Sequence, residues 1–199
     1  MLTKLFVGLT FFEDNHFAKK IQSYRGRYDE KLLTNPTVFM PIVPPFEIPI
    51  TELGSLQEEI VEEMEGFFPD DQNVLSLGFT GIDVYTRARK MTLYLHPQEL
   101  TDLSHCAESL TQICRDHVEL REHRPSEKDK GFLTIGRFTD PVALTDAMTV
   151  AQREFQDCTA LPVKGVCLFQ KHNGVWFQQT DLYRFGQTDE SSMYAPGKR

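Results

Sequence analysis

The order of the predicted elements is the feature of this sequence that most limits its fold. A helix, a strand, a second helix and a β-hairpin follow one another twice, and one further strand precedes the first copy. Side-chain identity between the copies is slight, so the sequence predicts a duplicated architecture and not a detectable sequence repeat. The chain is therefore expected to form an α+β protein made of two similar halves.

Turn and cap signals set the boundaries of these elements. Asp14 or Asn15 can cap the first helix, Pro44, Pro45 and Pro49 predict an extended connection that cannot be a central strand, and Asn173-Gly174 predicts the turn of the last hairpin. The first half is expected to contain a strand at 2–10, a helix at 16–28, a strand at 37–43, a helix at 52–67 and a hairpin within 73–96. The second half is expected to contain a helix at 97–120, a strand at 131–137, a helix at 140–155 and a hairpin within 162–185.

Length and charge limit the classes of function. The chain has 199 residues, and we expect one two-lobed domain over residues 1–187 followed by a flexible polar tail at 188–199. Lys and Arg number 21 against 29 Asp and Glu, and the resulting net charge of −8 repels a long polyphosphate unless a local basic patch overrides it. A long nucleic-acid partner is therefore not expected.

Cysteine usage and hydropathy favour a cytoplasmic protein. Cys106, Cys114, Cys158 and Cys167 show neither CxxC spacing nor a dense framework, which predicts reduced thiols and not disulfides or zinc ligands. No apolar run approaches the roughly 20 residues of a membrane span. The apolar start "LFVGLTFF" favours a buried strand over a secretion signal, since acidic residues follow at once. We expect no membrane partner, no metal and no cofactor.

Two segments point to a known family. "SYRGRYDEKLLTNPTVFMPIVPPFEI" resembles the first half of a bacterial subgroup of the two-histidine (2H) phosphoesterase superfamily, the LigT-like or 2′-5′ RNA ligase family. In that subgroup a Tyr-Arg-x-x-Tyr-Asp helix end precedes the first His-x-Thr motif, and Pro-Pro-Phe-Glu follows it. "GFLTIGRF" resembles the strand of the second motif. The resemblance implies the LigT-like fold, with two antiparallel sheets, helices on their outer faces, a central cleft and a pseudo-twofold axis.

The resemblance also implies that both motifs are degenerate. Counting along the flanking segments, which places the motif strands near 38–43 and 131–137, aligns the motifs with Phe39-Met40-Pro41 and Phe132-Leu133-Thr134, so only Thr134 is kept. In the family the two histidines act as general acid and base on a 2′,3′-cyclic or related phosphodiester, and the hydroxyls hold the phosphate. A phenyl ring cannot transfer a proton. Because each positioned acid or base contributes about 10²–10⁴ in rate, we expect no catalytic residue here.

Strand alternation indicates which side chains line the cleft. Phe39 and Pro41 share one face of the first motif strand, and Phe132 and Thr134 share one face of the second, so the cleft is predicted to be largely aromatic and apolar. The opposite faces, which are expected to pack on helices, carry Val38, Met40, Ile42, Leu133 and Ile135.

Thr37 and Arg137 are further candidates for the cleft. Thr37 lies two residues before Phe39 and shares its face. Arg137 falls with the helix-packing set by alternation, and is a secondary candidate for contact with an anion in the cleft.

Three functions are compatible with these observations. In the first, a non-catalytic protein binds a small ligand, nucleotide-like or apolar, or a segment of a partner protein in its cleft. In the second, aromatic side chains fill the cleft and the protein serves as a scaffold. In the third, the chain is an RNA 2′,3′-cyclic phosphodiesterase-like or ligase-like enzyme of altered chemistry. The cluster His117, Glu119, Glu122 and His123 matches no metal-binding spacing.

Overall fold

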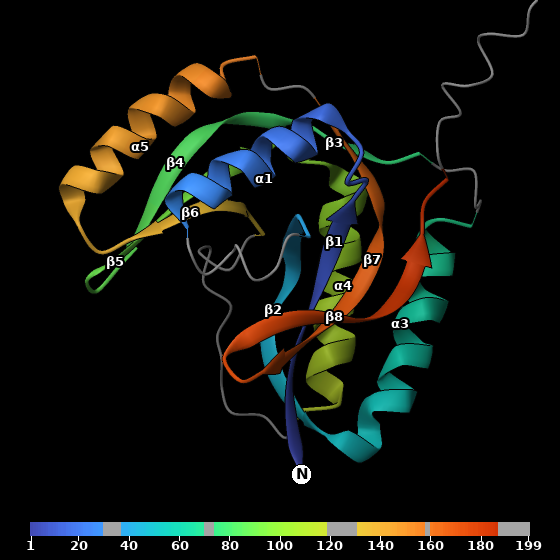
Figure 1. Ribbon diagram of the computed structural model, residues 1–199. Coiled ribbons are helices and arrows are strands. Elements are labelled where there is room, and N and C mark those ends of the chain that lie inside the picture. Colours follow the sequence, from blue (N-terminus) through green and yellow to red (C-terminus); the bar gives the residue numbers. More distant parts are fainter. Residues whose placement is uncertain (30–36, 70–73, 119–130, 158–159, 187–199) are drawn as a thin grey trace, which may run out of the picture.

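A computed structural model describes residues 1–29, 37–69, 74–118, 131–157 and 160–186. Its helices and strands follow the predicted order (Figure 1). In chain order they are β1 (Leu2–Phe11), α1 (His16–Tyr28), β2 (Phe39–Pro49), the 3₁₀ helix η1 (Ile50–Glu52), α3 (Leu53–Phe67), β3 (Ser76–Leu77), β4 (Phe79–Arg87), β5 (Lys90–Pro97), α4 (Thr101–Asp116), β6 (Leu133–Phe138), α5 (Pro141–Glu154), β7 (Leu161–His172) and β8 (Val175–Arg184).

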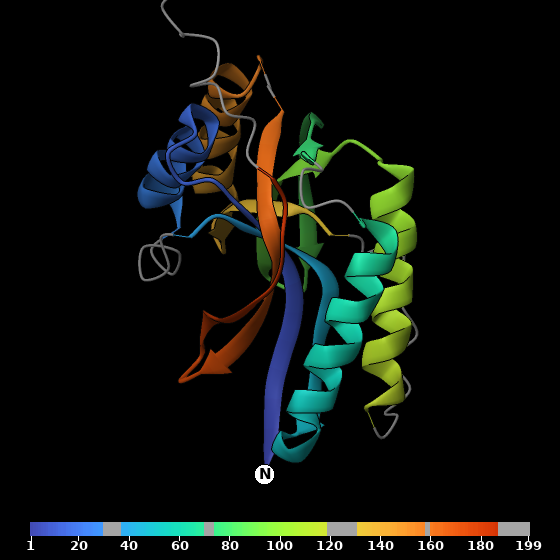
Figure 2. The ribbon, with the colours of Figure 1, turned by 90° about the vertical axis from the view of Figure 1, so that its right-hand side faces the viewer.

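The strands form two antiparallel sheets, each covered by a pair of helices. The larger sheet has the order β2-β1-β7, with both β3 and β8 paired to β7, and the smaller sheet has the order β4-β5-β6. Helices α3 and α4 pack on the larger sheet, and α1 and α5 pack on the smaller one. Figure 2 shows these helix pairs on opposite sides of the molecule. The predicted α+β fold with two antiparallel sheets is confirmed.

Each lobe combines strands from both halves of the chain. The first motif strand, β2, shares its sheet with the β7–β8 hairpin of the second half, whereas the second motif strand, β6, pairs with the β4–β5 hairpin of the first half. Strand β1 lies between β2 and β7 and joins the two contributions. Each half of the chain therefore contributes its motif strand to one lobe and its hairpin to the other.

Local signals explain where several elements begin and turn. The Asn15 side chain accepts hydrogen bonds from the N–H groups of Phe17 and Ala18, and so caps α1. Asn173 and Gly174 turn the β7–β8 hairpin with positive φ values of 48° and 85°. These elements are local, which is why the sequence predicts them well.

Two boundaries differ from the expectation. Helix α4 begins at Thr101, four residues after the predicted start. The proline-rich stretch is not a connection, because β2 continues through it to Pro49. It can do so because β2 is an edge strand. On the open side of an edge strand no neighbouring strand would accept a hydrogen bond from the backbone N–H, so proline, which lacks this group, is tolerated there.

The described residues show no helix that is long and apolar enough to cross a membrane. Cys106, Cys114 and Cys167 are buried free thiols. Cys158 and the tail at 188–199 lie outside the described residues.

The chain just before β6 passes close to β2 at Gly131. A Cβ atom built on this residue would lie 2.1 Å from the carbonyl oxygen of Pro41. The contact is with main chain, which cannot rotate away as a flexible side chain can. Only glycine therefore permits this crossing.

We predict that Gly131→Ala destabilises the protein strongly. Overpacking of this kind costs about 1–3 kcal/mol, and occasionally more, because the backbone of β2 must shift. Gly54→Ala is the matched control, since a Cβ at position 54 in α3 meets nothing within 4 Å and alanine favours a helix. Urea unfolding of both variants checks the prediction, and equal midpoints would contradict it.

Candidate functional site

A cavity of about 90 Å³ lies between the two motif strands. It is large enough for several water molecules, which each need roughly 10–15 Å³ of such volume. The lining combines aromatic, apolar and basic side chains: Phe6, Arg25, Phe39, Pro41, Pro45, Thr134, Arg137 and Trp176. Four of the candidate cleft residues thus meet at one cavity: Phe39, Pro41, Thr134 and the secondary candidate Arg137. Phe132 is not part of its lining.

The side of the cavity formed by the larger sheet is an aromatic cluster. Phe6 and Phe169 are stacked, with ring centroids 4.5 Å apart and an interplanar angle of 5°. Phe39, which is 8% exposed, lies 5.4 Å from Phe6 and 4.9 Å from Phe169. Trp176 meets Phe6 edge-on at 4.7 Å. Packing against these rings therefore holds the Phe39 side chain in place.

Phe132 packs separately, on the smaller sheet. Its ring centroid lies 4.4 Å from that of Tyr94 and 6.4 Å from that of Tyr85. Among the rings of the described residues, no contact joins Phe132 to Phe39. Phe39 thus packs at the cavity, whereas Phe132 packs against tyrosines outside its lining.

Arg25 of α1 is a buried charge at this cavity. It is 4% exposed, and its Nε and Nη2 atoms donate to the carbonyl oxygen of Thr134 at 2.8 and 2.6 Å. Its Nη1 atom reaches the carbonyl of Thr37 at 3.5 Å, and the guanidinium lies 5.9 Å from the Phe39 ring centroid. Among the described residues, no ion pair joins Arg25 to a carboxylate.

The protonation of Arg25 follows from this environment. Burial, and then the neighbouring charge of Arg137, lower the pKa of Arg25 to about 9, while Asp29 acts in the opposite direction. The guanidinium is still charged at neutral pH. A bound anion would therefore relieve a buried and incompletely neutralised positive charge.

Arg137 reaches the cavity because β6 contains a bulge. Gly136 pairs with Leu93 and Thr134 pairs with Tyr94, so Ile135 is an extra residue in β6. The bulge reverses the alternation after Ile135. Arg137, a secondary cleft candidate that alternation alone places with the helix-packing set, therefore lines the cavity together with Thr134.

Asp29 is the acidic neighbour of Arg137. An Arg137 Nη1 atom lies 3.6 Å from Asp29 Oδ2, and the two side chains are 43% and 2% exposed. The backbone N–H of Asp29 also donates to the carbonyl of Arg25, which ends α1. The helix end thus places Arg25 and the partner of Arg137 next to each other.

The other candidates do not contribute side chains to the cavity. Thr37 offers its carbonyl to Arg25, and its side chain is not in the lining. His117 contacts Glu59 at 3.0 Å and Glu52 at 3.6 Å on the α3–α4 surface. Within the described residues no group of three or more His, Cys, Asp or Glu could hold a metal ion. Glu119, Glu122 and His123 lie outside those residues.

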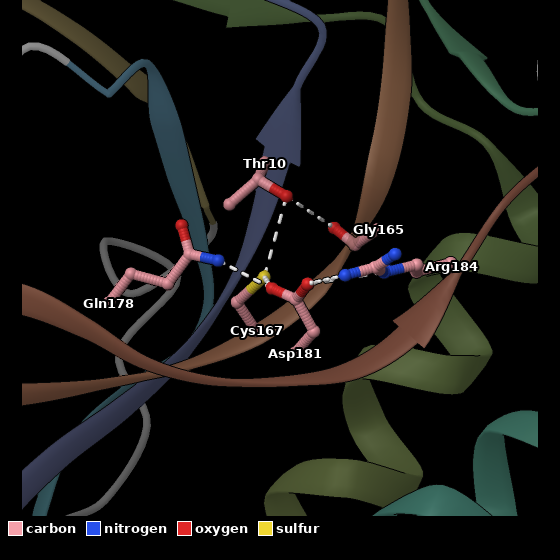
Figure 3. A network of polar contacts seen from close by, with 6 residues as sticks. All are labelled: Thr10, Gly165, Cys167, Gln178, Asp181 and Arg184. Atoms are coloured by element: carbon pink, nitrogen blue, oxygen red, sulfur yellow. Dashed lines mark hydrogen bonds and ion pairs between the residues drawn. The ribbon is translucent and has the colours of Figure 1, made fainter.

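A polar network fixes the strand that carries Trp176 (Figure 3). Register shifts in β8 fall on both sides of Asp181, whose carboxylate accepts hydrogen bonds from Gln178, Arg184 and the Cys167 thiol. Bulges bend a strand, so this network stabilises the curl that brings the hairpin tip across the aromatic cluster. Burial raises the pKa of Cys167 to about 12, so the thiol is a donor here and not a nucleophile.

Sequence reasoning missed Arg25, Phe6, Pro45 and Trp176 as cavity residues. Arg25 had a usable signal, because it lies four residues after Ile21 and so shares the buried face of α1. It also belongs to the Tyr-Arg-x-x-Tyr-Asp segment that carried the family resemblance. Phe6 and Trp176 carry no such signal, because their positions depend on sheet order and on the curl of β8.

Comparison with known proteins establishes the family. A model of the 2′-5′ RNA ligase superfamily matches residues 12–175. The chain belongs to this superfamily. A comparison with curated proteins found no sequence match.

Similar solved structures confirm the LigT-like fold. LigT of E. coli with 3′-AMP has a TM-score of 0.57 and 14% identity, and the match covers 95% of this chain and 100% of that chain. LigT of E. coli with ATP has a TM-score of 0.53 and 12% identity, with 93% and 99% covered. A structure described as a phosphoesterase has a TM-score of 0.53 and 13% identity, with 92% and 99% covered.

We predict that Arg25→Met destabilises the protein more than Arg27→Met. The first change leaves the buried carbonyl of Thr134 without its donors, which costs about 1–3 kcal/mol. Arg27 forms a largely exposed ion pair with Glu154, and such pairs contribute about 0–1 kcal/mol. Chemical unfolding of the two variants measures the difference, and a larger loss for Arg27→Met would refute it.

Proposed function

We propose that this protein is a non-catalytic member of the superfamily whose central cavity binds the anionic group of a small ligand. The observation that carries the proposal is the pair of guanidinium groups at the cavity. Among the described residues the hydrogen-bond acceptors of buried Arg25 are main-chain carbonyls, and Arg137 and Thr134 line the same cavity. Guanidinium groups bind phosphate and carboxylate in a planar, bidentate way.

The aromatic cluster gives the cavity a second kind of recognition. Phe6, Phe39 and Trp176 line the cavity together with the cationic groups. An apolar wall with a few convergent polar groups is the usual composition of a small-ligand site. A ligand with an anionic group and a planar or apolar part fits this combination, and a nucleotide is one such ligand.

The proposed lack of catalysis rests on the chemistry of the lining. The lining contains no histidine, cysteine or carboxylate that could transfer a proton. Phe39 and Phe132 are each packed against other rings, so neither position leaves room for a residue that moves in from elsewhere. Asp29, the nearest acid, faces Arg137.

We predict no turnover of nucleoside 2′,3′-cyclic phosphates by the purified protein. The reaction needs a general base and a general acid, and each contributes about 10²–10⁴ in rate. Product formation measured by chromatography should equal the rate without protein. Turnover that persists through purification and disappears in Thr134→Val would overturn the non-catalytic part of the proposal.

We also predict saturable binding of phosphate-bearing nucleotides. LigT of E. coli has been solved with ATP, 3′-AMP and NADP+, and these compounds are suitable probes. Trp176 is the single tryptophan of the chain and lines the cavity, so its fluorescence should change with 3′-AMP and not with adenosine. Thr134→Val should weaken this binding, since the hydroxyl is removed at constant shape.

Thr111→Val is the control, because this residue lies on α4 away from the cavity and its hydroxyl donates only to a helix carbonyl. Equal binding of adenosine and 3′-AMP would show that no anionic group is recognised. The absence of binding to any probe, including inorganic phosphate, would overturn the ligand-binding proposal.

A further inference from the structure

A larger groove opens beside the central cavity. It encloses about 1150 Å³ and shares Phe39, Arg137 and Trp176 with the cavity. Besides Phe39 of β2, four separate parts of the chain line it: the end of α1 at 27–29, the β4–β5 hairpin at 85–92, the end of β6 with the start of α5 at 137–143, and the tip of the β7–β8 hairpin at 173–176. The central cavity can hold a small anion without this groove, so the groove is available for a second, larger ligand.

The groove is basic although the protein is acidic. Its lining carries Arg27, Arg87, Lys90 and Arg137, against the single carboxylate of Asp29, while the whole chain has a net charge of −8. Among the described residues neither Arg87 nor Lys90 forms an ion pair. Two exposed cations are therefore available to a ligand with several negative charges.

Two aromatic rings of the groove, Tyr28 and Trp176, are packed against neighbouring side chains. Tyr28 packs on Tyr24 with centroids 4.6 Å apart and lies under the Arg27 guanidinium. Trp176 meets Phe6, and Lys171 lies 5.6 Å from its centroid. Single-stranded nucleic acids bind largely through bases stacked on free ring faces. A single-stranded nucleic acid needs several free ring faces in succession, which these packed rings do not offer, whereas the one planar group of a small ligand can still lie against Trp176 in the central cavity.

A strand edge within the groove favours a peptide. Strand β6 is the last strand of the smaller sheet, and within the described residues no strand pairs with it on the side away from β5. Arg137 and Phe138 of this edge line the groove, as do residues on both sides of it. Arg25 already occupies the Thr134 carbonyl, so the part of this edge that is open to an extended peptide is the end of the strand at Arg137 and Phe138.

We propose that this groove binds an extended acidic peptide segment of a partner protein, with Arg87 and Lys90 contacting its carboxylates. Main-chain hydrogen bonds to β6 orient the segment, and the basic side chains select its charge. The site differs from the central cavity in that neither Arg87 nor Lys90 lines that cavity. The two sites can therefore be tested separately.

The test uses the full chain and a fluorescein-labelled decaglutamate peptide. Fluorescence anisotropy should show saturable binding that weakens as salt is raised, because the contacts are exposed ion pairs. Arg87→Glu with Lys90→Glu should weaken binding by about tenfold or more, since each reversal replaces attraction by repulsion. The same variant should retain the change in Trp176 fluorescence with 3′-AMP. Thr134→Val, in contrast, should bind the peptide with unchanged affinity.

The matched control is Lys19→Glu with Arg153→Glu, which changes the net charge equally at exposed positions outside the groove. Equal weakening by the control pair would show that only the overall charge matters, and would overturn the proposal. Tighter binding of a decauridylate RNA than of the peptide would assign the groove to nucleic acid instead. An all-D decaglutamate that binds as well as the L form would exclude pairing with β6, and no binding of the L peptide would reject the site.

Discussion

The buried guanidinium of Arg25 is the interaction on which the relative position of the two motif strands depends. It extends from α1 to the carbonyl of Thr134 in β6 and to the carbonyl of Thr37, just before β2. All of these acceptors are main-chain atoms. The geometry is therefore independent of the side chains at the motif positions, and Phe39 or Phe132 can stand there without displacing the strands. The fold can keep its central cavity while the chemistry at the cavity changes.

Local patterns account for most of the fold that could be predicted from the sequence. The cap at Asn15, the turn at Asn173-Gly174 and the helical spacing of Leu56, Ile60 and Met64 each depend on residues close in the chain. The exchange of hairpins between the lobes could not be predicted in this way. It depends on which strands pair at long range, and element order alone does not specify this.

The candidate site shows that strand alternation predicts which way a side chain faces only as far as the next bulge. Alternation correctly assigned Met40, Leu133 and Ile135 to the main core, but it misplaced Arg137 because the bulge at Ile135 is a property of the pairing with β5. Arg25 was missed for a different reason. From sequence alone, an arginine near the buried face of a helix is expected to extend its guanidinium into solvent. Its burial can be predicted only when carbonyl acceptors are known to lie beside it.

The position of β1 between β2 and β7 has a consequence for how the chain reaches its native state. Leu5 of β1 pairs with Phe46 on one side and with Gln170 on the other. During synthesis on the ribosome β1 can form its hairpin-like pairing with β2 early, but its second edge has no native partner until nearly the whole chain has emerged. Such distant pairing slows folding, because a long loop must close before its contacts stabilise the sheet. The apolar edge of β1 is thus an aggregation-prone surface in the nascent chain, which a chaperone would be expected to protect.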